Sequence, residues 1–228
     1  MISLSVKGIL FDFGGTLDAA GVPWKERFRR LFSEFGVTVG PERFDHAFYD
    51  ADDALVGRLS ADANLTETVH RLAVGVARNL GVPGDRIGRE VAENFLRESF
   101  HFFRRNRPVL ERLSKRFRLG IVSNFYGNLQ AVCAEAEIEE FFDPLIDSTV
   151  VGVSKPDPKI FRAGFEPWRL PPERVLFVGD SPNRDMAGAK ALGMPHIRLL
   201  PPERLKQATL CCPGDRAITS LKELWGGG

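Results

Sequence analysis

Short apolar runs that alternate with helix-like segments limit the fold of this chain more than any other feature. Four such runs are present, the last of them weaker than the others: 6–11, 119–122, 175–178 and 196–199. Segments with helical spacing of apolar residues, such as 126–138 and 184–192, lie between them. Continuous apolar strands that alternate with helices are typical of a parallel sheet buried on both faces. The pattern therefore predicts an α/β fold.

The strand pattern stops after the first run and does not return for almost ninety residues. Over this stretch the apolar residues instead recur at helical spacing, as in 24–35 and 86–103. We therefore expect an all-helical insert between the first strand and the rest of the sheet. Pro108 is predicted to begin the next helix, because proline is favoured in the first helical turn.

Composition narrows the class of protein. The net charge of the 228-residue chain is +1, which provides no basic surplus for binding nucleic acid. The N-terminal run is too short for a signal peptide, and no run approaches the ~20 apolar residues of a membrane span. Three cysteines, Cys133, Cys211 and Cys212, are odd in number and poorly spaced for a metal site. We expect three buried thiols in a cytoplasmic protein that binds neither nucleic acid nor membrane.

The first strand ends in the run FDFGGTLD at 11–18. This order places the carboxylate of Asp12 on a tight turn, where the glycines let the backbone approach a ligand closely. Such a carboxylate can attack an electrophilic phosphorus and form a covalent intermediate. Taken alone, an ordinary strand end and turn explains the run about as well.

Three later turns also carry polar groups. Ser123 ends the second apolar run and can hold phosphate oxygens together with backbone N–H groups, although taken alone a helix N-cap explains it better. Lys155, just before a predicted helix, can neutralise a phosphate or an attacking carboxylate, although taken alone it lies in an ordinary proline-rich turn. Asp180 and Asp185 offer hard oxygen ligands suited to Mg²⁺, or else an N-cap with a solvated partner. Strand-end groups share one edge of a parallel sheet, where ligands bind.

Together these four motifs closely resemble those of the haloacid dehalogenase-like hydrolase superfamily, and the resemblance covers the whole chain. It implies a Rossmann-like parallel sheet core, flanked by helices, at 1–17 and 107–228. It also implies that the all-helical insert at 18–106 is a cap domain.

The resemblance implies a role for each matching residue. Asp12 would be the nucleophile, oriented by Thr16. The positions matching the family's phosphate-binding groups are Ser123, Asn124 and Lys155. The positions matching its metal ligands are Asp12, Asp180, Asp185 and, through the backbone carbonyl, Gly14. The resemblance thus implies a Mg²⁺-dependent phosphatase that acts on a small phosphorylated molecule.

One position departs from the phosphatase pattern. Gly14 stands where most phosphatases of this family have a second Asp, which acts as general acid and base. Glycine cannot transfer a proton, so we expect turnover to depend strongly on the pKa of the leaving group. That expectation fails if Asp18 or a carboxylate of the insert takes over the role.

The same departure keeps other functions open. A 2-haloacid dehalogenase expels halide and needs no proton donor, but dehalogenases resembling this fold lack the metal-binding Gly-Asp pair that this chain has. A phosphonatase would need a Schiff-base lysine in the insert, where Lys25 is the sole lysine. We expect Lys25 to lie on the exposed face of its helix. A non-catalytic binding relative is a further alternative, and the complete motif set argues against it.

Overall fold

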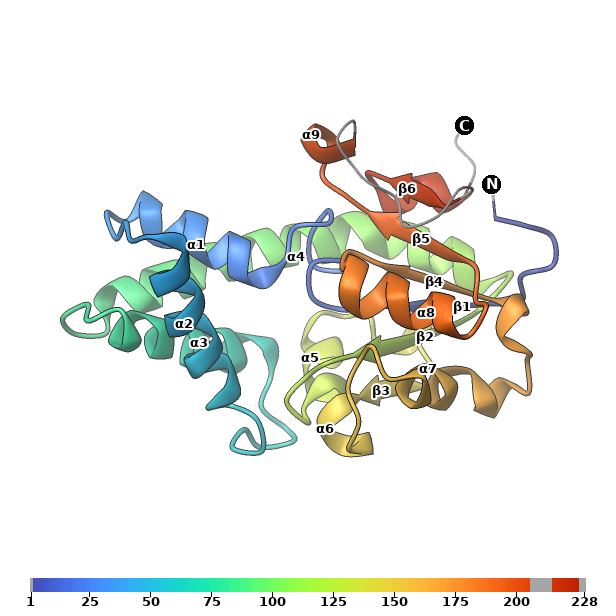
Figure 1. Ribbon diagram of the computed structural model, residues 1–228, viewed down its shortest axis with the longest axis horizontal. Helices are drawn as coiled ribbons and strands as arrows, with labels where there is room; N and C mark the ends of the chain where they lie inside the picture. Colours follow the sequence, from blue (N-terminus) through green and yellow to red (C-terminus); the bar gives the residue numbers. More distant parts are fainter. Residues whose placement is uncertain (1, 206–214, 226–228) are drawn as a thin grey trace.

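A six-stranded parallel sheet forms the centre of the computed structural model, which describes residues 2–205 and 215–225 (Figure 1). Its strand order is β3-β2-β1-β4-β5-β6, and every neighbouring pair is parallel. The strands are β1 (Gly8–Phe11), β2 (Arg118–Ser123), β3 (Leu145–Asp147), β4 (Val175–Gly179), β5 (His196–Leu199) and β6 (Arg216–Ile218). The sheet confirms the predicted α/β class, including the weaker fourth run.

Helices cover both faces of this sheet, and the alternation of side chains along β1 shows how. Ile9 and Phe11 point into a hydrophobic cluster that contains Leu113 of helix α4 (Arg86–Ser114). Leu10 points the other way, into a cluster with Phe161 of helix α7 (Pro158–Phe165). Because both faces are buried, each strand reads as a continuous apolar run.

The remaining helices around the sheet are short. The α-helices are α5 (Leu129–Glu135), α6 (Ser148–Val151), α8 (Ala187–Ala191) and α9 (Pro202–Leu205). The 3₁₀ turns are η1 (Glu139–Phe141), η2 (Glu166–Trp168), η3 (Pro172–Arg174) and η5 (Leu221–Trp225). A π-helical turn, η4 (Pro182–Met186), directly precedes α8. Helix α5 is therefore shorter than the predicted helix at 126–138, and α8 begins later than the predicted helix at 184–192. Among the described residues, no helix is both long and apolar enough to cross a membrane.

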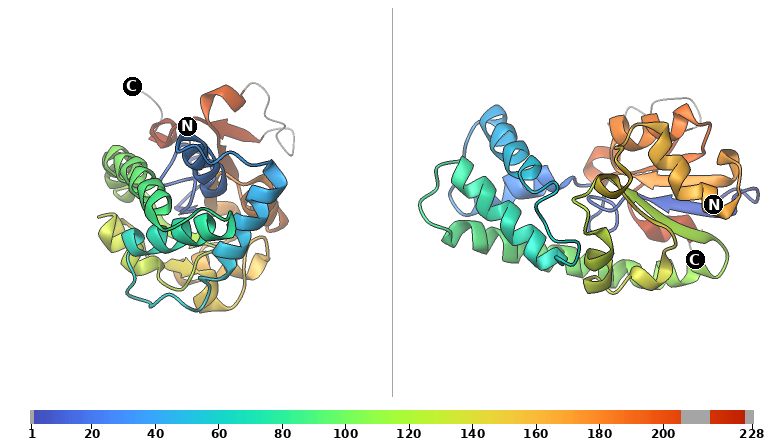
Figure 2. Two further views of the ribbon diagram at one scale, coloured as in Figure 1. Left: turned by 90° about the vertical axis from the view of Figure 1, so that its left-hand side faces the viewer. Right: turned by 90° about the horizontal axis from the view of Figure 1, so that it is seen from below.

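Every element described between β1 and β2 is a helix. These helices are α1 (Trp24–Glu34), α2 (Pro41–Asp53), α3 (Leu65–Asn79) and α4. They form a group beyond the carboxyl ends of the strands, seen at the left in Figure 1 and in the right-hand view of Figure 2. Phe28, Phe95 and Leu72 are fully buried inside the group and belong to the same hydrophobic cluster that covers one face of the sheet.

The prediction that Pro108 begins a new helix is wrong. Pro108 lies inside α4, a single helix of 29 residues that runs from the insert to the sheet (Figure 2). Proline removes one helical hydrogen bond and crowds the carbonyl of Arg104. Burial on both sides outweighs that cost, because Phe103 before the proline and Val109 and Leu110 after it are packed in the core.

Candidate active site

The carboxyl ends of the three central strands bring the predicted polar residues together. Asp12 directly follows β1, Ser123 is the last residue of β2, and Asp180 directly follows β4. The chain leaves β1 toward β2 and β3 on one side and later returns through β4 on the other. Strand order therefore reverses between β1 and β4, and such a switch point is the usual ligand crevice of an open α/β sheet.

Three carboxylates gather at this crevice. Asp12, Asp180 and Asp185 each offer an oxygen within 4.8 Å of the other two, and all three side chains are buried. The backbone turns beside them leave no room for larger residues. Gly15 has φ +88°, and a Cβ there would lie 2.5 Å from Asp180 Oδ2. A Cβ at Gly179 would likewise overlap the Asp185 carboxylate.

Lys155 joins two of these carboxylates. Its buried ammonium donates to Asp12 Oδ1 at 2.6 Å and to Asp185 Oδ1 at 2.7 Å. Ser123 Oγ donates to the same Asp12 oxygen at 3.2 Å. Burial by itself lowers the pKa of Lys155, but Asp12 and Asp185 outweigh it and raise the pKa above its usual value. Lys155 is therefore held as a cation against the site.

One lysine does not balance three acids. Burial raises the pKa of Asp12 to about 6, with Lys155 opposing the shift and Asp185 adding to it. Burial also raises the pKa of Asp180 well above its usual value, and the charges of Asp12 and Asp185 add to the effect. Asp180 Oδ2 is buried and has no hydrogen-bond partner within the described residues. Three hard oxygen ligands with surplus negative charge and an unpartnered oxygen fit a divalent cation.

Two further predicted residues lie around this cluster. Asn124 clamps the backbone of Lys155, accepting from its N–H at 2.7 Å and donating to its carbonyl at 3.1 Å. Thr16 is fully buried, and its hydroxyl has no partner within the described part of the chain. For two motifs, the alternative interpretation without a functional role is wrong. Asn128, not Ser123, is the N-cap of α5, and the Asp185 side chain is 1% exposed rather than solvated.

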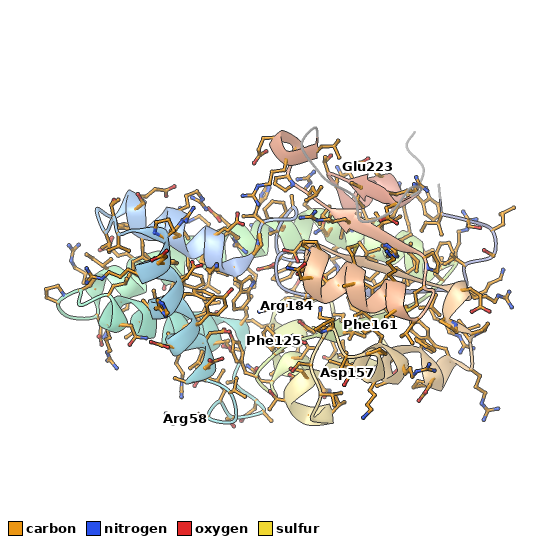
Figure 3. The ribbon with its side chains drawn as sticks, viewed as in Figure 1. Arg58, Phe125, Asp157, Phe161, Arg184 and Glu223 are labelled. Atoms are coloured by element: carbon orange, nitrogen blue, oxygen red, sulfur yellow. The ribbon has the colours of Figure 1, made fainter. Side chains whose placement is uncertain are left out.

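A cavity of about 580 Å³ opens between this cluster and the helical insert. Gly14, Asn124 and the charged cluster line its sheet side. Aromatic side chains from both parts line much of the rest: Trp24, Phe48, Tyr49, Phe125 and Tyr126. Figure 3 shows Phe125 and Arg184, another lining residue, where the insert meets the sheet. The cavity thus presents a charged floor and a wall in which aromatic side chains are mixed with charged ones such as Lys25, Asp52 and Arg184.

The insert contributes lining residues that the sequence did not reveal. The prediction that Lys25 lies on an exposed face is wrong, because Lys25 lines the cavity and its ammonium pairs with Asp45 at 2.6 Å. Tyr49 and Asp52 of α2 also line it. Phe48, Tyr49 and Asp52 have helical spacing, which suggests a shared face, but spacing does not say what that face looks toward.

Asp18, the other candidate for the missing acid, does not line the cavity. It is fully buried and accepts from Gly15 N at 2.7 Å, from Trp24 Nε1 at 2.8 Å and from Arg27 Nη1 at 2.7 Å. Together these donors hold the Asp18 carboxylate in one position. Asp18 is therefore part of the framework that joins the loop after β1 to the insert.

Cys133 is a buried thiol, as predicted. Cys133 is buried in α5, and burial raises the pKa of its thiol, which keeps it protonated. Cys211 and Cys212 lie outside the described residues.

Comparison with known proteins agrees with this geometry. Residues 6–193 match the family model described as a haloacid dehalogenase-like hydrolase. The bovine (Bos taurus) haloacid dehalogenase-like hydrolase domain-containing protein 3 is 33% identical over 108 residues, which are 47% of this chain and 43% of that protein. The glyceraldehyde 3-phosphate phosphatase of Pyrococcus abyssi is 38% identical over 90 residues, 39% of this chain and 38% of that protein. The match thus spans less than half the length of each relative.

A solved structure supports the fold over nearly the whole chain. A dehalogenase crystallised as an intermediate complex superposes with a TM-score of 0.64 at 18% identity, covering 98% of this chain and 97% of that one. At this identity the likeness concerns the fold alone. With the family match over residues 6–193, the sheet and the strand-end motifs identify the chain as a member of the haloacid dehalogenase-like hydrolase family.

Proposed function

We propose that this hydrolase is a Mg²⁺-dependent phosphatase that acts on a small phosphomonoester through an aspartyl-phosphate on Asp12. The observation that carries the proposal is the buried cluster of Asp12, Asp180 and Asp185 around Lys155. A halide-releasing enzyme has no need of surplus carboxylates at this place. A phosphoryl group and a divalent cation together would balance them.

The residues divide the chemistry between them. Asp12 attacks phosphorus, and its carboxylate is positioned by the hydrogen bonds from Lys155 and Ser123. Lys155 and Ser123 also lie where they can donate to the phosphoryl oxygens, and Asn124 holds the Lys155 backbone for that purpose. We expect buried Thr16 to support the loop that carries Asp12. Asp12, Asp180, Asp185 and the Gly14 carbonyl would hold Mg²⁺, which neutralises the charge of the phosphoryl group.

The relatives support the same class of reaction. The Pyrococcus abyssi protein is named as a phosphatase of glyceraldehyde 3-phosphate, a small phosphomonoester. The cavity of about 580 Å³ has room for a molecule of this kind. We expect the lining residues of the insert, among them Lys25, Tyr49 and Asp52, to select the substrate.

A direct assay tests the proposal. p-Nitrophenyl phosphate should be hydrolysed with Mg²⁺, the activity should disappear with a chelator, and it should return when Mg²⁺ is restored. Beryllium fluoride should form an adduct on Asp12 in crystals. Full activity after exhaustive metal removal, or turnover of 2-chloropropionate without metal, would instead support the dehalogenase alternative, which Gly14 favours because halide leaves without a proton.

We also propose that residues 18–106 act as a cap that closes over the site. Side chains of the two parts already bond to each other, Glu26 with Arg204 at the cavity and Thr66 with Glu135 outside it. Closure would keep water from the phosphoryl-enzyme until the leaving group has departed. Crystals with and without a phosphate mimic should differ in the position of the insert relative to the sheet. Identical positions in both would contradict a closing motion.

A further inference from the structure

Gly14 leaves the proposed phosphatase without the usual proton donor, and the leaving oxygen of an alkyl ester needs one. Within the described residues, five carboxylates line the cavity. Asp12, Asp180 and Asp185 belong to the buried cluster. Glu26 is held in an ion pair with Arg204 at 2.5 Å. Asp52 is the carboxylate that remains.

Asp52 projects from the insert toward the sheet side of the cavity. It lies in the last turn of α2, and Tyr126, in the segment between β2 and α5, donates its hydroxyl proton to Asp52 Oδ1. Tyr126 follows Ser123 closely in the chain and is itself buried. This bond holds the Asp52 carboxyl beside the segment that carries Ser123, whose hydroxyl in turn donates to Asp12. The Asp52 side chain makes no other hydrogen bond or ion pair within residues 2–205 and 215–225.

The surroundings of Asp52 favour its protonated form more than those of an ordinary surface Asp. Burial raises its pKa, the Tyr126 hydrogen bond lowers it, neighbouring Asp53 raises it, and Arg184 lowers it. The net effect is an increase. A general acid works best when its pKa is near the operating pH, and this shift moves Asp52 in that direction.

We propose that Asp52 is the general acid and base of this enzyme, held in place by Tyr126. The inference rests on the proposed phosphatase function. As the Asp12 oxygen bonds to phosphorus and the ester P–O bond breaks, the Asp52 carboxyl gives its proton to the departing oxygen, which leaves as an alcohol. Asp52, now a carboxylate, then takes a proton from the water that attacks phosphorus. Phosphate and free Asp12 are released, and Asp52 is again protonated.

The test is a series of phosphate monoesters graded by leaving-group pKa, from p-nitrophenyl through phenyl to ethyl phosphate, assayed with Mg²⁺ and compared by kcat/KM. Asp52→Asn should reduce kcat/KM for ethyl phosphate by ~10²–10⁴-fold and for p-nitrophenyl phosphate far less, because only the poor leaving group needs the proton. The wild-type series should be nearly flat, and the variant series steep. Asp50→Asn is the matched control, since it removes an exposed charge of the same helix that is not among those shifting the pKa of Asp52, and it should leave the series unchanged.

The pH profile adds a second measurement. A general acid must be protonated, so wild-type kcat/KM for ethyl phosphate should fall as the pH rises through the pKa of Asp52. Asp52→Asn should lose that descending limb. Tyr126→Phe removes the hydrogen bond that lowers the pKa of Asp52, so its limb should move to higher pH. A purely structural role for Tyr126 would lower activity without moving the limb.

The outcomes separate the two proposals. Equal slopes and an identical descending limb in wild type and Asp52→Asn, with Asp12 still phosphorylated, would overturn the role of Asp52 alone. A loss in Asp52→Asn of equal size for every ester, in kcat/KM, would also overturn it and make Asp52 a binding residue. Absence of any phosphate release by the wild type with Mg²⁺ would overturn the phosphatase function and this inference with it.

Discussion

Asp12 and Asp18 are both buried carboxylates of the same loop, yet their surroundings differ in kind. Asp18 is sealed from solvent and surrounded by donors, including the Arg27 guanidinium at 2.7 Å. Asp12 has Lys155 and Ser123 as partners but shares its site with two further carboxylates and borders the cavity. A fully satisfied carboxylate stabilises a fold, whereas one surrounded by like charge is held ready for a cation and a substrate.

The largest effect should follow from changing Asp12, which shares its site with two other carboxylates. Asp12→Asn keeps the shape of the side chain but removes the nucleophile, and turnover should fall on the order of 10⁴-fold or more, as it does when a member of a catalytic unit is lost. Thermal unfolding should show little loss of stability, because Lys155 retains Asp185. Near wild-type turnover would mean that water attacks the substrate directly.

Changing Asp18, whose carboxylate is surrounded by hydrogen-bond donors, should instead lower the stability of the fold. Asp18→Asn leaves the buried Arg27 charge with only the half-buried Glu98, at 3.4 Å, as a counter-ion. The free energy of unfolding should therefore fall by ~3 kcal/mol, the lower end of the range for breaking a buried ion pair. Urea denaturation measures this effect. Asp85→Asn is the control, because it breaks an exposed ion pair with Arg78 and should cost at most ~1 kcal/mol. If Asp18→Asn and Asp85→Asn were equally stable, Asp18 would have no special role in stabilising the fold and would not differ from Asp12 in that respect.

A smaller effect should come from the backbone under Asp180. Gly15→Ala introduces a Cβ at φ +88°, 2.5 Å from Asp180 Oδ2, and so displaces a proposed metal ligand. The Mg²⁺ concentration for half-maximal activity should rise by ~10–100-fold, the range for disturbing a ligand through its support. Gly36→Ala is the control, since Gly36 has φ +81° but nothing within 4 Å of the added carbon. An unchanged Mg²⁺ requirement would remove Asp180 from the metal site.

The smallest effect should be that of restoring the family's usual acid. If Asp52 already transfers the proton, Gly14→Asp should raise kcat/KM for ethyl phosphate by less than ~10-fold. A Cβ at Gly14 would meet Trp24 Nε1 at 3.1 Å, so the indole must move slightly to admit the side chain. The same substitution in the Asp52→Asn background should have a larger effect. A large gain in the wild-type background would mean that no carboxyl currently fills the role.

The fold was predictable where the sequence carries a strong periodic signal. The four apolar runs became β1, β2, β4 and β5, and the helical insert appeared where the strand pattern stops. The edge strands β3 and β6 were missed, because each has three residues and too few positions to show a pattern. The prediction that Pro108 begins a helix was wrong, because tertiary packing along α4 outweighs the preference of proline for the first helical turn.

The site was predictable on its sheet side only. Asp12, Ser123 and Asp180 end strands, and parallel strands bring their ends together whatever the loops do. Asp52 and Lys25 reach the cavity through the packing of helices against one another, and no local signal in the sequence encodes that orientation. Asp18 illustrates the same limit. Its partner Arg27 comes from α1, and no local signal in the sequence shows that the two side chains meet.

Helix α4 gives the molecule a mechanical element. At a rise of ~1.5 Å per residue its 29 residues form a rod of ~43 Å, anchored in the sheet at one end and carrying the insert at the other. Pro108 removes a backbone bond near the anchored end, and we expect any bending of the helix to occur there. A bend of ~10° there would swing Arg86, ~33 Å away along the rod, through ~6 Å. The cap would then open as a lever, and crystals with and without a phosphate mimic should differ by flexure of α4 at Pro108.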